Sequence, residues 1–334
     1  METPLKQIPV VTELSVKDFN EQYFENNIPV IIKGYMKKTQ AYKTWTPDHL
    51  STVIGSRMIN LAYSQKGVYN FQKGQAVHLN MPFNEAVTYM QLNNSYYISQ
   101  SSLQDNFPEL VNDVTDPEWI GPSDPRRSTN LWFGGAGCVS PLHFDTSHNF
   151  LAQIYGRKDI TLYAPADSKY LYPSSSNVSA IDMEDAAKFP LFKYAKPYPV
   201  VLEPGDILYL PFYWWHLVRS LDVSISVNFW WERFEFVYGA GIEMAPVEEL
   251  KKMIRRFLDM GIPVDQKNSE GETNLLKACD RGAVNIVRAL LESGADPTVI
   301  SNKYKGSAAV TIAAERGHTQ IVDMLYQHTR LLEL

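Results

Sequence analysis

The spacing of hydrophobic residues in this chain changes near residue 240. Between residues 131 and 233 the hydrophobic runs are short, and residues 224–230 alternate between polar and apolar side chains. Such alternation is typical of β-strands with two different faces. Beyond residue 240 the hydrophobic spacing becomes helical and aromatic residues become scarce. The sequence therefore predicts a mainly β domain at residues 1–240, with its core at 131–233, followed by an all-α domain at residues 241–334.

The predicted β core consists of short strands separated by turns. Residues 151–155 and 159–163 are predicted strands on either side of a turn at residues 156–157, which is the pattern of a β-hairpin. Another turn, at residues 204–206, precedes an apolar strand at residues 207–210. Short strands at regular spacing favour a double-sheet jelly roll, also called a double-stranded β-helix, with flanking helices.

Two further features flank or interrupt this core. Thr46-Pro47-Asp48 has the composition of a helix start: a hydroxyl at the N-cap, proline at the first helical position and an acid in the first turn. A plain turn is the alternative. Residues 167–199 show no strand or helix pattern. Loops of that length inside a compact domain are usually functional or disordered.

The C-terminal part contains an internal repeat. Arg281-Gly282 recurs as Arg316-Gly317 at an offset of 35 residues. Repeats of about this length that contain paired helices stack on one another. This part resembles ankyrin repeats, with one half-repeat and two fuller ones. Thr273-Asn274-Leu275-Leu276 stands where ankyrin repeats carry Thr-Pro-Leu-His. A generic helical bundle is the alternative.

The composition limits the partners and the compartment. The formal net charge is -6, and a negative surface repels phosphate backbones, so nucleic-acid binding is not expected. The 2 cysteines lie far apart, which argues for a reducing compartment. The chain shows neither a signal peptide nor an apolar run of about 18 residues, so no membrane association is expected. We expect a cytoplasmic or nuclear protein, and leave a non-classical route of export open.

Two histidines and one acid are candidate metal ligands. Residues two apart on a strand point to the same face, so His143 and Asp145 can converge on one point. Such a pair is expected roughly once by chance in this composition, so alone it is weak. His216 follows a turn and an apolar strand. Two histidines and a carboxylate form the facial triad that leaves positions on Fe(II) open. In the alternative, both histidines are core residues satisfied by hydrogen bonds.

Lys158 is a candidate cosubstrate-binding residue. It shares its predicted strand face with the apolar residues Ile160 and Leu162. A lysine on an inward face needs an anion, because a buried ammonium without a partner is costly. A cosubstrate carboxylate would supply that anion. The alternative is a lysine at the exposed end of the strand.

Polar residues on the neighbouring predicted strands extend the candidate site. Asn228 shares a strand face with Ser224, Ser226 and Trp230. This polar stripe indicates either a solvated face or a polar barrel interior. Asn149 lies six residues after His143 and faces the metal if the strand is unbroken. His148 then points the other way and is not assigned as a ligand.

Together these residues resemble a known family. The motifs that carry the resemblance are Ser140-Pro141-Leu142-His143-Phe144-Asp145, Asn149-Phe150, Gly156-Arg157-Lys158, Pro204-Gly205-Asp206, Tyr213-Trp214-Trp215-His216 and Asn228-Phe229-Trp230. Over residues 9–233 the chain resembles the JmjC/cupin-like family of Fe(II)- and 2-oxoglutarate-dependent oxygenases. Within that family the closest likeness is to the asparaginyl hydroxylases.

The resemblance implies a role for each matching residue. His143, Asp145 and His216 look like the iron ligands. The residues that look like cosubstrate-binding residues are Tyr97, Ser140, Asn149, Lys158 and Asn228, with Lys158 and Tyr97 on the distal carboxylate of 2-oxoglutarate. The substrate pocket would include Ser99 and Trp230.

Two departures from the family pattern concern the substrate. Ser99 stands where the asparaginyl hydroxylases have a glutamine that contacts the substrate. Ser175-Ser176 aligns with their Arg-Gln pair, which clamps the target asparagine. The resemblance therefore covers the residues that bind iron and the cosubstrate. It does not cover the residues that bind the target asparagine in the asparaginyl hydroxylases.

The resemblance implies a dioxygenase that uses Fe(II), 2-oxoglutarate and O2, releases succinate and CO2, and hydroxylates a side chain of a protein. The ankyrin-like tail would help recruit that protein. The alternatives with the same chemistry are a modified tRNA base, a methylated lysine or arginine, and a small molecule. The acidic net charge counts against tRNA. A catalytically silent binding scaffold is the alternative of another class, and homodimerisation is left open.

Overall fold

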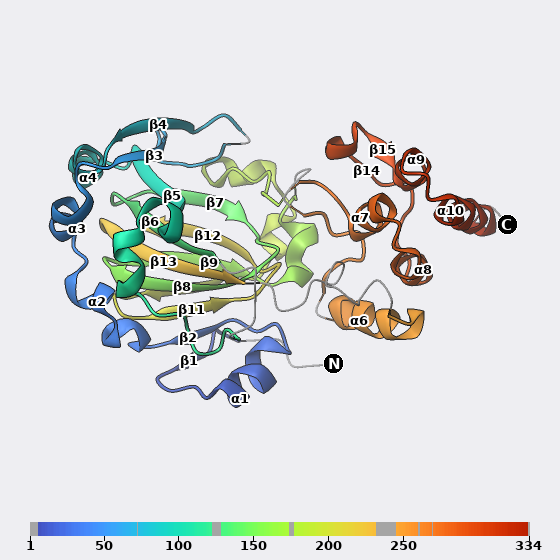
Figure 1. Cartoon of the computed structure of the whole chain (residues 1–334), viewed down its shortest axis with the longest axis horizontal. Coiled ribbons are helices and arrows are strands. Elements are labelled where there is room, and N and C mark those ends of the chain that lie inside the picture. Colours follow the sequence, from blue (N-terminus) through green and yellow to red (C-terminus); the bar gives the residue numbers. More distant parts are fainter. Residues whose placement is uncertain are drawn as a thin grey trace. The chain divides into compact units, whose positions relative to one another are not determined.

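The structure, a computed structural model, describes residues 6–71, 73–121, 128–173, 177–231, 245–259, 261–268 and 270–332. These residues form two compact units, one built around β-sheets and one that contains the C-terminal helices (Figure 1). The domain boundary predicted at residue 240 lies outside the described ranges. Among the described helices, none has both the length and the apolar character that crossing a membrane requires.

Within the described residues, the larger sheet has nine strands. In spatial order they are β1 (Val10–Val11), β2 (Val30–Ile32), β11 (Ile207–Leu210), β8 (His148–Tyr155), β13 (Ser224–Trp231), β6 (Ser128–Gly134), β5 (Tyr96–Ser102), β3 (Met58–Tyr63) and β4 (Val77–Pro82). Neighbouring strands run antiparallel except β1 and β2. The strands predicted at 207–210 and 224–230 are confirmed as β11 and β13.

In the described part of the chain, the smaller sheet has four strands. In spatial order they are β10 (Tyr198–Leu202), β9 (Lys158–Tyr163), β12 (Trp215–Ser220) and β7 (Val139–His143). From β6 to β9, and again from β10 to β13, consecutive strands alternate between the two sheets. Two antiparallel sheets connected in this way form a double-stranded β-helix, so the predicted jelly roll is confirmed.

The predicted hairpin across residues 156–157 is wrong. Both strands exist, but β8 pairs with β11 and β13 in the larger sheet, whereas β9 pairs with β10 and β12 in the smaller one. Gly156 forms the corner between them: its φ is +66°, and a Cβ there would lie 2.1 Å from the carbonyl oxygen of Val223. Turn residues indicate that the chain changes direction, but they do not determine which strand it then pairs with.

Helices of the N-terminal part cover one face of the larger sheet. They are α1 (Val16–Asp18), η1 (Phe19–Phe24), η2 (Tyr35–Lys38), α2 (Gln40–Thr44), α3 (Pro47–Ile54), α4 (Phe83–Leu92), α5 (Leu103–Asn106) and η3 (Pro108–Asp113). The ring of Phe19 lies 5.5 Å from that of Phe150 on β8. The ring of Phe83 lies 5.8 Å from that of Phe133 on β6. The main hydrophobic core of this unit therefore lies between that sheet face and the helices.

The helix start predicted at Thr46-Pro47-Asp48 is confirmed. Helix α3 begins at Pro47, and the side-chain oxygen of Thr46 accepts a hydrogen bond of 3.1 Å from the backbone N–H of His49. This bond satisfies one of the N–H groups that the first turn of a helix leaves without an intrahelical partner.

Residues 164–195 leave the sheets between β9 and β10 (Figure 1). They contain short 3₁₀ helices at Pro165–Tyr170 (η4), Met183–Lys188 (η5) and Phe192–Tyr194 (η6). The irregular segment predicted at 167–199 is thus present but ends earlier, because β10 begins at Tyr198. Ser175 and Ser176, which the sequence alignment singles out, lie outside the described residues.

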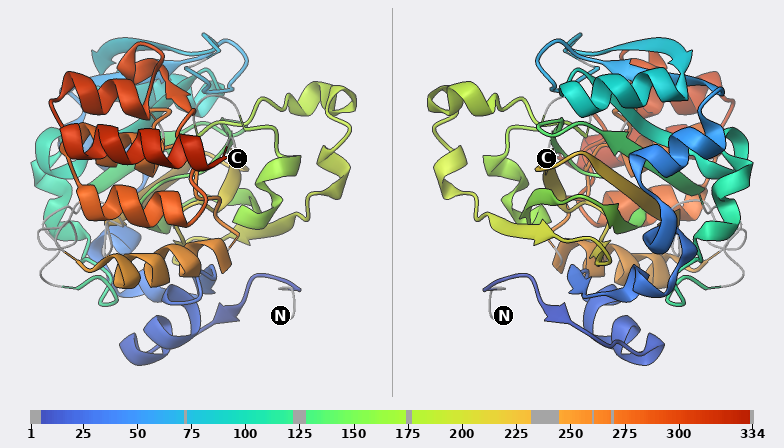
Figure 2. Two further views of the ribbon diagram at one scale, coloured as in Figure 1. Left: turned by 90° about the vertical axis from the view of Figure 1, so that its right-hand side faces the viewer. Right: turned by 90° about the vertical axis from the view of Figure 1, so that its left-hand side faces the viewer.

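The C-terminal unit consists of paired helices joined by tight turns. Its elements are α6 (Val247–Asp259), α7 (Asn274–Arg281), α8 (Val284–Glu292), β14 (Ile300–Ser301), η8 (Asn302–Tyr304), β15 (Ser307–Ala308), α9 (Ala309–Glu315) and α10 (Thr319–Leu332). The left view of Figure 2 shows these helices in parallel rows, and Leu275, Ile286 and Ile312 belong to the one buried cluster between them. The pairing agrees with the predicted repeat stack.

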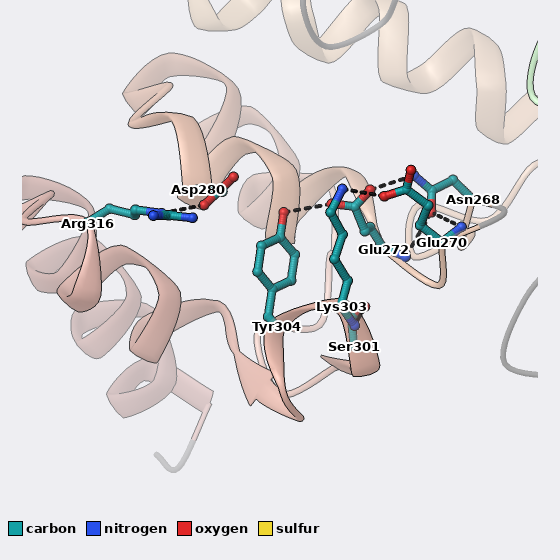
Figure 3. A network of polar contacts seen from close by, with 8 residues as sticks. All are labelled: Asn268, Glu270, Glu272, Asp280, Ser301, Lys303, Tyr304 and Arg316. Carbon is teal, nitrogen blue, oxygen red and sulfur yellow. Dashed lines mark hydrogen bonds and ion pairs between the residues drawn. The ribbon is translucent and has the colours of Figure 1, made fainter.

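A buried carboxylate links two successive repeats (Figure 3). Glu272, which is 3% exposed, accepts hydrogen bonds from Tyr304 Oη at 2.6 Å and from Asn268 Nδ2 at 2.8 Å. Lys303 Nζ lies 3.2 Å from the same carboxylate. Burial raises the pKa of Glu272, but the hydrogen bonds from Tyr304, Asn268 and Lys303 outweigh burial and lower it overall. Glu272 therefore stays ionised and holds the next repeat through Tyr304 and Lys303.

We expect Tyr304→Phe to lower the free energy of unfolding of the repeats by about 1.5–3 kcal/mol, because it removes a hydrogen bond to a buried charge. All 7 tryptophans precede residue 240, so Trp fluorescence follows the β-rich unit and helical circular dichroism follows mainly the repeats. In a urea titration of the full chain, the circular-dichroism midpoint should fall while the fluorescence midpoint stays unchanged.

The matched control is Tyr326→Phe, the same change at a tyrosine that is 60% exposed. It should change the free energy of unfolding by less than about 0.5 kcal/mol. If both variants unfold at the midpoint of the native protein, the Glu272 contact does not stabilise the repeats.

Candidate metal centre

The two sheets of the jelly roll enclose a polar interior. Lys158 Nζ on β9 lies 3.5 Å from Tyr97 Oη on β5. Ser220 Oγ on β12 lies 3.1 Å from Ser224 Oγ on β13. Each contact joins the smaller sheet to the larger one, so the strand faces that carry these residues point toward each other. Because side chains alternate along a strand, residues two positions away share the same interior.

The structure brings the three predicted metal ligands together. His143 ends β7 and lies directly opposite His216 on β12, with 4.1 Å between the ring centroids. Asp145 follows two residues after His143. One ligand atom from each of His143, Asp145 and His216 lies within 4.8 Å of the others. These residues therefore form a group that a single metal ion could bridge.

Both histidines have the hydrogen bonds that a metal ligand needs. His143 Nδ1 lies 2.7 Å from the carbonyl oxygen of Pro141, and His216 Nδ1 lies 3.0 Å from that of Trp214. A carbonyl oxygen only accepts, so each Nδ1 must donate, which leaves Nε2 of a neutral ring able to bind a cation. Burial, followed by the nearby His143, lowers the pKa of His216 well below its ordinary value and keeps it neutral. This donor set fits Fe(II).

Lys158 is a buried ammonium group. Its side chain is 1% exposed, and within the described ranges its ammonium contacts Tyr97 Oη but forms no ion pair with a carboxylate. Burial lowers the pKa of Lys158 to about 8. Ser140 on β7 is hydrogen-bonded to the same Tyr97 hydroxyl. The alternative of an exposed strand-end lysine is therefore wrong, and the three side chains fit a dicarboxylate cosubstrate that supplies the missing negative charge.

Asn228, Trp230 and Asn149 also face the interior. Asn228 is almost fully buried, and its Oδ1 accepts a hydrogen bond of 3.2 Å from Asn130 Nδ2. The polar stripe on β13 is therefore part of the barrel interior and not a solvated face. Trp230 lies opposite Asn149 in the pairing of β13 with β8. Among the described residues, Trp230 Nε1 and Asn149 Oδ1 are buried without a hydrogen-bond partner.

Asn149 faces the interior, but not by the route that was predicted from the sequence. His143 and Asn149 do not share an unbroken strand, because β7 and β8 belong to different sheets. Asn149 faces the interior because it lies opposite Trp230 in the pairing of β8 with β13. His148, the adjacent residue, points to the opposite face, where its Nδ1 lies 2.8 Å from Tyr209 Oη.

Ser99 lies at a distortion of β5. The pairing of β5 with β6 shifts register between Ile98 and Ser101, and Gln100 has a φ of +49°. Ser99 lies within this irregular part of the strand and is half-buried. The place of Ser99 in the substrate pocket stays a prediction.

Sequence reasoning missed two residues of the interior and one beside the metal ligands. Trp132 on β6 lies opposite Ser226 and 6.4 Å from the ring of Trp230, and Gln153 accepts a hydrogen bond of 2.7 Å from Ser226 Oγ. The alternation of residues 128–134 could have revealed Trp132. Asn177, which contacts the backbone of Phe144, lies in an irregular segment and carries no such pattern.

A double-stranded β-helix that holds two histidines and a carboxylate in a polar interior defines a class of cupin-type metal proteins. A family model described as a cupin-like domain matches residues 16–235, and a model described as ankyrin repeats in three copies matches residues 244–332. The chain therefore belongs to the JmjC/cupin-like oxygenase family and carries C-terminal ankyrin repeats. Members of this family depend on Fe(II) and 2-oxoglutarate.

Several relatives are similar to this chain over the jelly roll. Lysine-specific demethylase 8 of Danio rerio is 37% identical over 239 residues, or 68% of this chain and 59% of that protein. JmjC domain-containing protein D of Dictyostelium discoideum is 32% identical over 239 residues, or 64% and 53%. tRNA wybutosine-synthesizing protein 5 of Gallus gallus is 29% identical over 252 residues, or 69% and 79%. The chain thus spans little more than half the length of the first two, and the particular likeness to the asparaginyl hydroxylases stays a prediction.

We expect His143→Ala and Asp145→Ala each to weaken Mn(II) binding by more than about 100-fold, since loss of a ligand exceeds the typical effect of losing an outer-shell partner. Titration of the full chain with Mn(II), followed by electron paramagnetic resonance, measures this. His148→Asn is the control, because its amide can still bond Tyr209 and His148 is not a proposed ligand. Native affinity in Asp145→Ala would place the metal elsewhere.

We also expect 2-oxoglutarate to bind the metal-loaded protein more weakly as the pH rises through about 8, where Lys158 loses its proton. Only the ammonium form pairs with a carboxylate, so the affinity is highest below this pKa and falls by up to about tenfold per pH unit above it. Tyr97 and Cys138 stay neutral in this window, because burial raises both pKa values, that of Cys138 to about 11.

Isothermal titration calorimetry across that pH window measures the effect. Lys158→Arg is the control, since a guanidinium keeps its charge throughout and should give a flat profile. A flat profile in the native protein would mean that Lys158 does not pair with the cosubstrate.

Proposed function

We propose that this chain hydroxylates a side chain of a protein, with Fe(II) bound by His143, Asp145 and His216, and that its ankyrin repeats help recruit that protein. The observation that carries the oxygenase chemistry is Lys158, a buried ammonium that has no carboxylate partner among the described residues and lies in the same interior as the candidate ligands. Fe(II) held by these residues would supply the oxygen chemistry, in which 2-oxoglutarate, O2 and a substrate C–H group give succinate, CO2 and a hydroxylated substrate.

The chain's own residues bind and orient the reactants. Lys158 and Tyr97 hold the distal carboxylate of 2-oxoglutarate, and Ser140 fixes the Tyr97 hydroxyl. The residues that extend this polar surface on the larger sheet are Asn149, Asn228 and Trp230, with Ser99 at the edge of the substrate pocket. A fixed set of donors in a site that excludes water orients the cosubstrate and limits side reactions.

A protein substrate is favoured by the combination of domains. Ankyrin repeats present extended surfaces to binding partners, and the relative in Danio rerio is named a lysine-specific demethylase. The relative in Gallus gallus is named for tRNA wybutosine synthesis, which keeps a tRNA base as the second candidate. The net charge of -6 disfavours a polyanion.

Mass spectrometry distinguishes these substrates. We expect candidate proteins incubated with the chain, Fe(II), 2-oxoglutarate and O2 to gain the mass of one oxygen, together with stoichiometric succinate. A methylated lysine or arginine substrate would instead lose the mass of a methylene group, because a hydroxylated N-methyl group leaves as formaldehyde. A modified tRNA nucleoside with unchanged proteins would support the tRNA reading.

Asp145→Ala is the control for each of these incubations, since it should abolish both the modified product and the succinate. If the native chain binds no metal and releases no succinate with or without substrates, the oxygenase proposal is wrong, and a silent binding scaffold takes its place.

A further inference from the structure

The two ligands His143 and Asp145 are joined by a single residue that has left the sheet. β7 ends at His143, where the chain pairs with His216 for the last time. Phe144 and Asp145 lie beyond this last matched pair of the ladder between β7 and β12. The two peptide groups between the ligands must be held by another part of the chain if the histidine ring and the carboxylate are to keep their relative orientation.

Asn177 makes a hydrogen bond to each of these two peptide groups. The backbone N–H of Phe144 donates to the carbonyl oxygen of Asn177 at 3.0 Å. The side-chain Nδ2 of Asn177 donates to the carbonyl oxygen of Phe144 at 2.7 Å. The first bond fixes the peptide plane between His143 and Phe144, and the second fixes the plane between Phe144 and Asp145. A single residue thus takes the place of a neighbouring strand at the point where the metal ligands lie.

Asn177 is itself held by a braced segment. The buried Ser179 donates from its Oγ to the carbonyl oxygen of Leu171 at 2.5 Å and accepts from the N–H of Ile181 at 3.0 Å. The N–H of Ala180 donates to the carbonyl oxygen of Tyr172 at 2.8 Å. The bonds to Leu171 and Tyr172 thus connect the residues that follow Asn177 to residues that precede it.

We infer that Asn177 is a positioning residue of the metal centre, whose side-chain amide orients the peptide that carries Asp145. The inference rests on the proposed function, because it takes His143, Asp145 and His216 as the metal ligands. Phe144 is 1% exposed, so water does not readily replace a lost partner of its carbonyl oxygen. Outer-shell partners of metal ligands typically change metal affinity by about 10–100-fold, which sets the expected effect.

The side-chain bond can be removed without touching the main-chain bond. Asn177→Ala deletes the amide donor and leaves the carbonyl oxygen of Asn177 in place. Asn177→Asp keeps the shape but presents a carboxylate, which cannot donate to the Phe144 carbonyl oxygen. The aspartate variant should therefore weaken metal binding at least as much as the alanine variant, and it serves as the deciding variant if Asn177→Ala does not fold.

Asn94→Ala is the matched control. Asn94 Nδ2 donates to the carbonyl oxygen of Gly137 at 3.3 Å, just before β7 begins. It is the same kind of amide-to-carbonyl bond at the opposite end of the strand that carries His143. Its loss should lower the thermal stability of the metal-free protein but leave metal affinity unchanged.

The experiment is a Mn(II) titration of the full chain without 2-oxoglutarate, followed by electron paramagnetic resonance, with circular dichroism of the metal-free proteins as a check of folding. We expect Asn177→Ala to bind Mn(II) about 10–100-fold more weakly than the native protein, with Asn94→Ala as native. Unchanged affinity in the folded Asn177 variants would overturn the inference. Equal weakening in Asn94→Ala would also overturn it, since the effect would then be general.

Asp145→Ala separates this inference from the proposed function. If the native chain binds Mn(II), Asp145→Ala does not, and the Asn177 variants bind normally, the positioning role is wrong while the metal site stands. If the native chain and Asp145→Ala bind Mn(II) equally, the ligand assignment itself is wrong, and the role of Asn177 falls with it.

Discussion

The polar interior of the jelly roll determines where the rest of the structure can place its hydrophobic core. Lys158, Asn228 and Gln153 are buried between the two sheets, so this space cannot supply most of the apolar burial that folding requires. The core lies instead on the other face of the larger sheet, where the N-terminal helices pack on residues such as Phe150 and Phe133. The first half of the chain is therefore as necessary to the site as the strands that carry it.

Local patterns predicted the elements better than their pairing. The alternation of residues 224–230 and the cap at Thr46 each depend on neighbours in the sequence, and both predictions were correct. The hairpin across Gly156 failed because a turn signal is local, whereas the choice of sheet depends on strands far away in the chain. Asn149 was placed on the interior through an unbroken strand that does not exist.

The grouping of the three candidate ligands was predictable mainly from the sequence motifs that surround them. His143 and Asp145 alone have a chance-level spacing, and only the resemblance of several motifs in order distinguished them. Asn177 could not be found in this way, since it lies 33 residues from its partner Phe144 and in a segment without periodicity. Residues that hold ligands through the backbone need no particular motif, so they become visible only when the chain is folded.

The glycine corner at residue 156 has a consequence for the chemistry of the interior. It joins two sheets, and the next strand begins at Lys158, whose neighbour Asp159 faces the opposite side and lies across from Arg219. Side chains alternate strictly along a strand, so deleting one residue at this corner would turn the lysine outward and the aspartate inward. The interior would then repel a dicarboxylate instead of attracting it. The sign of the charge in the polar interior thus depends on the number of residues in the turn at Gly156. A deletion in this turn would be more harmful than most substitutions in the pocket.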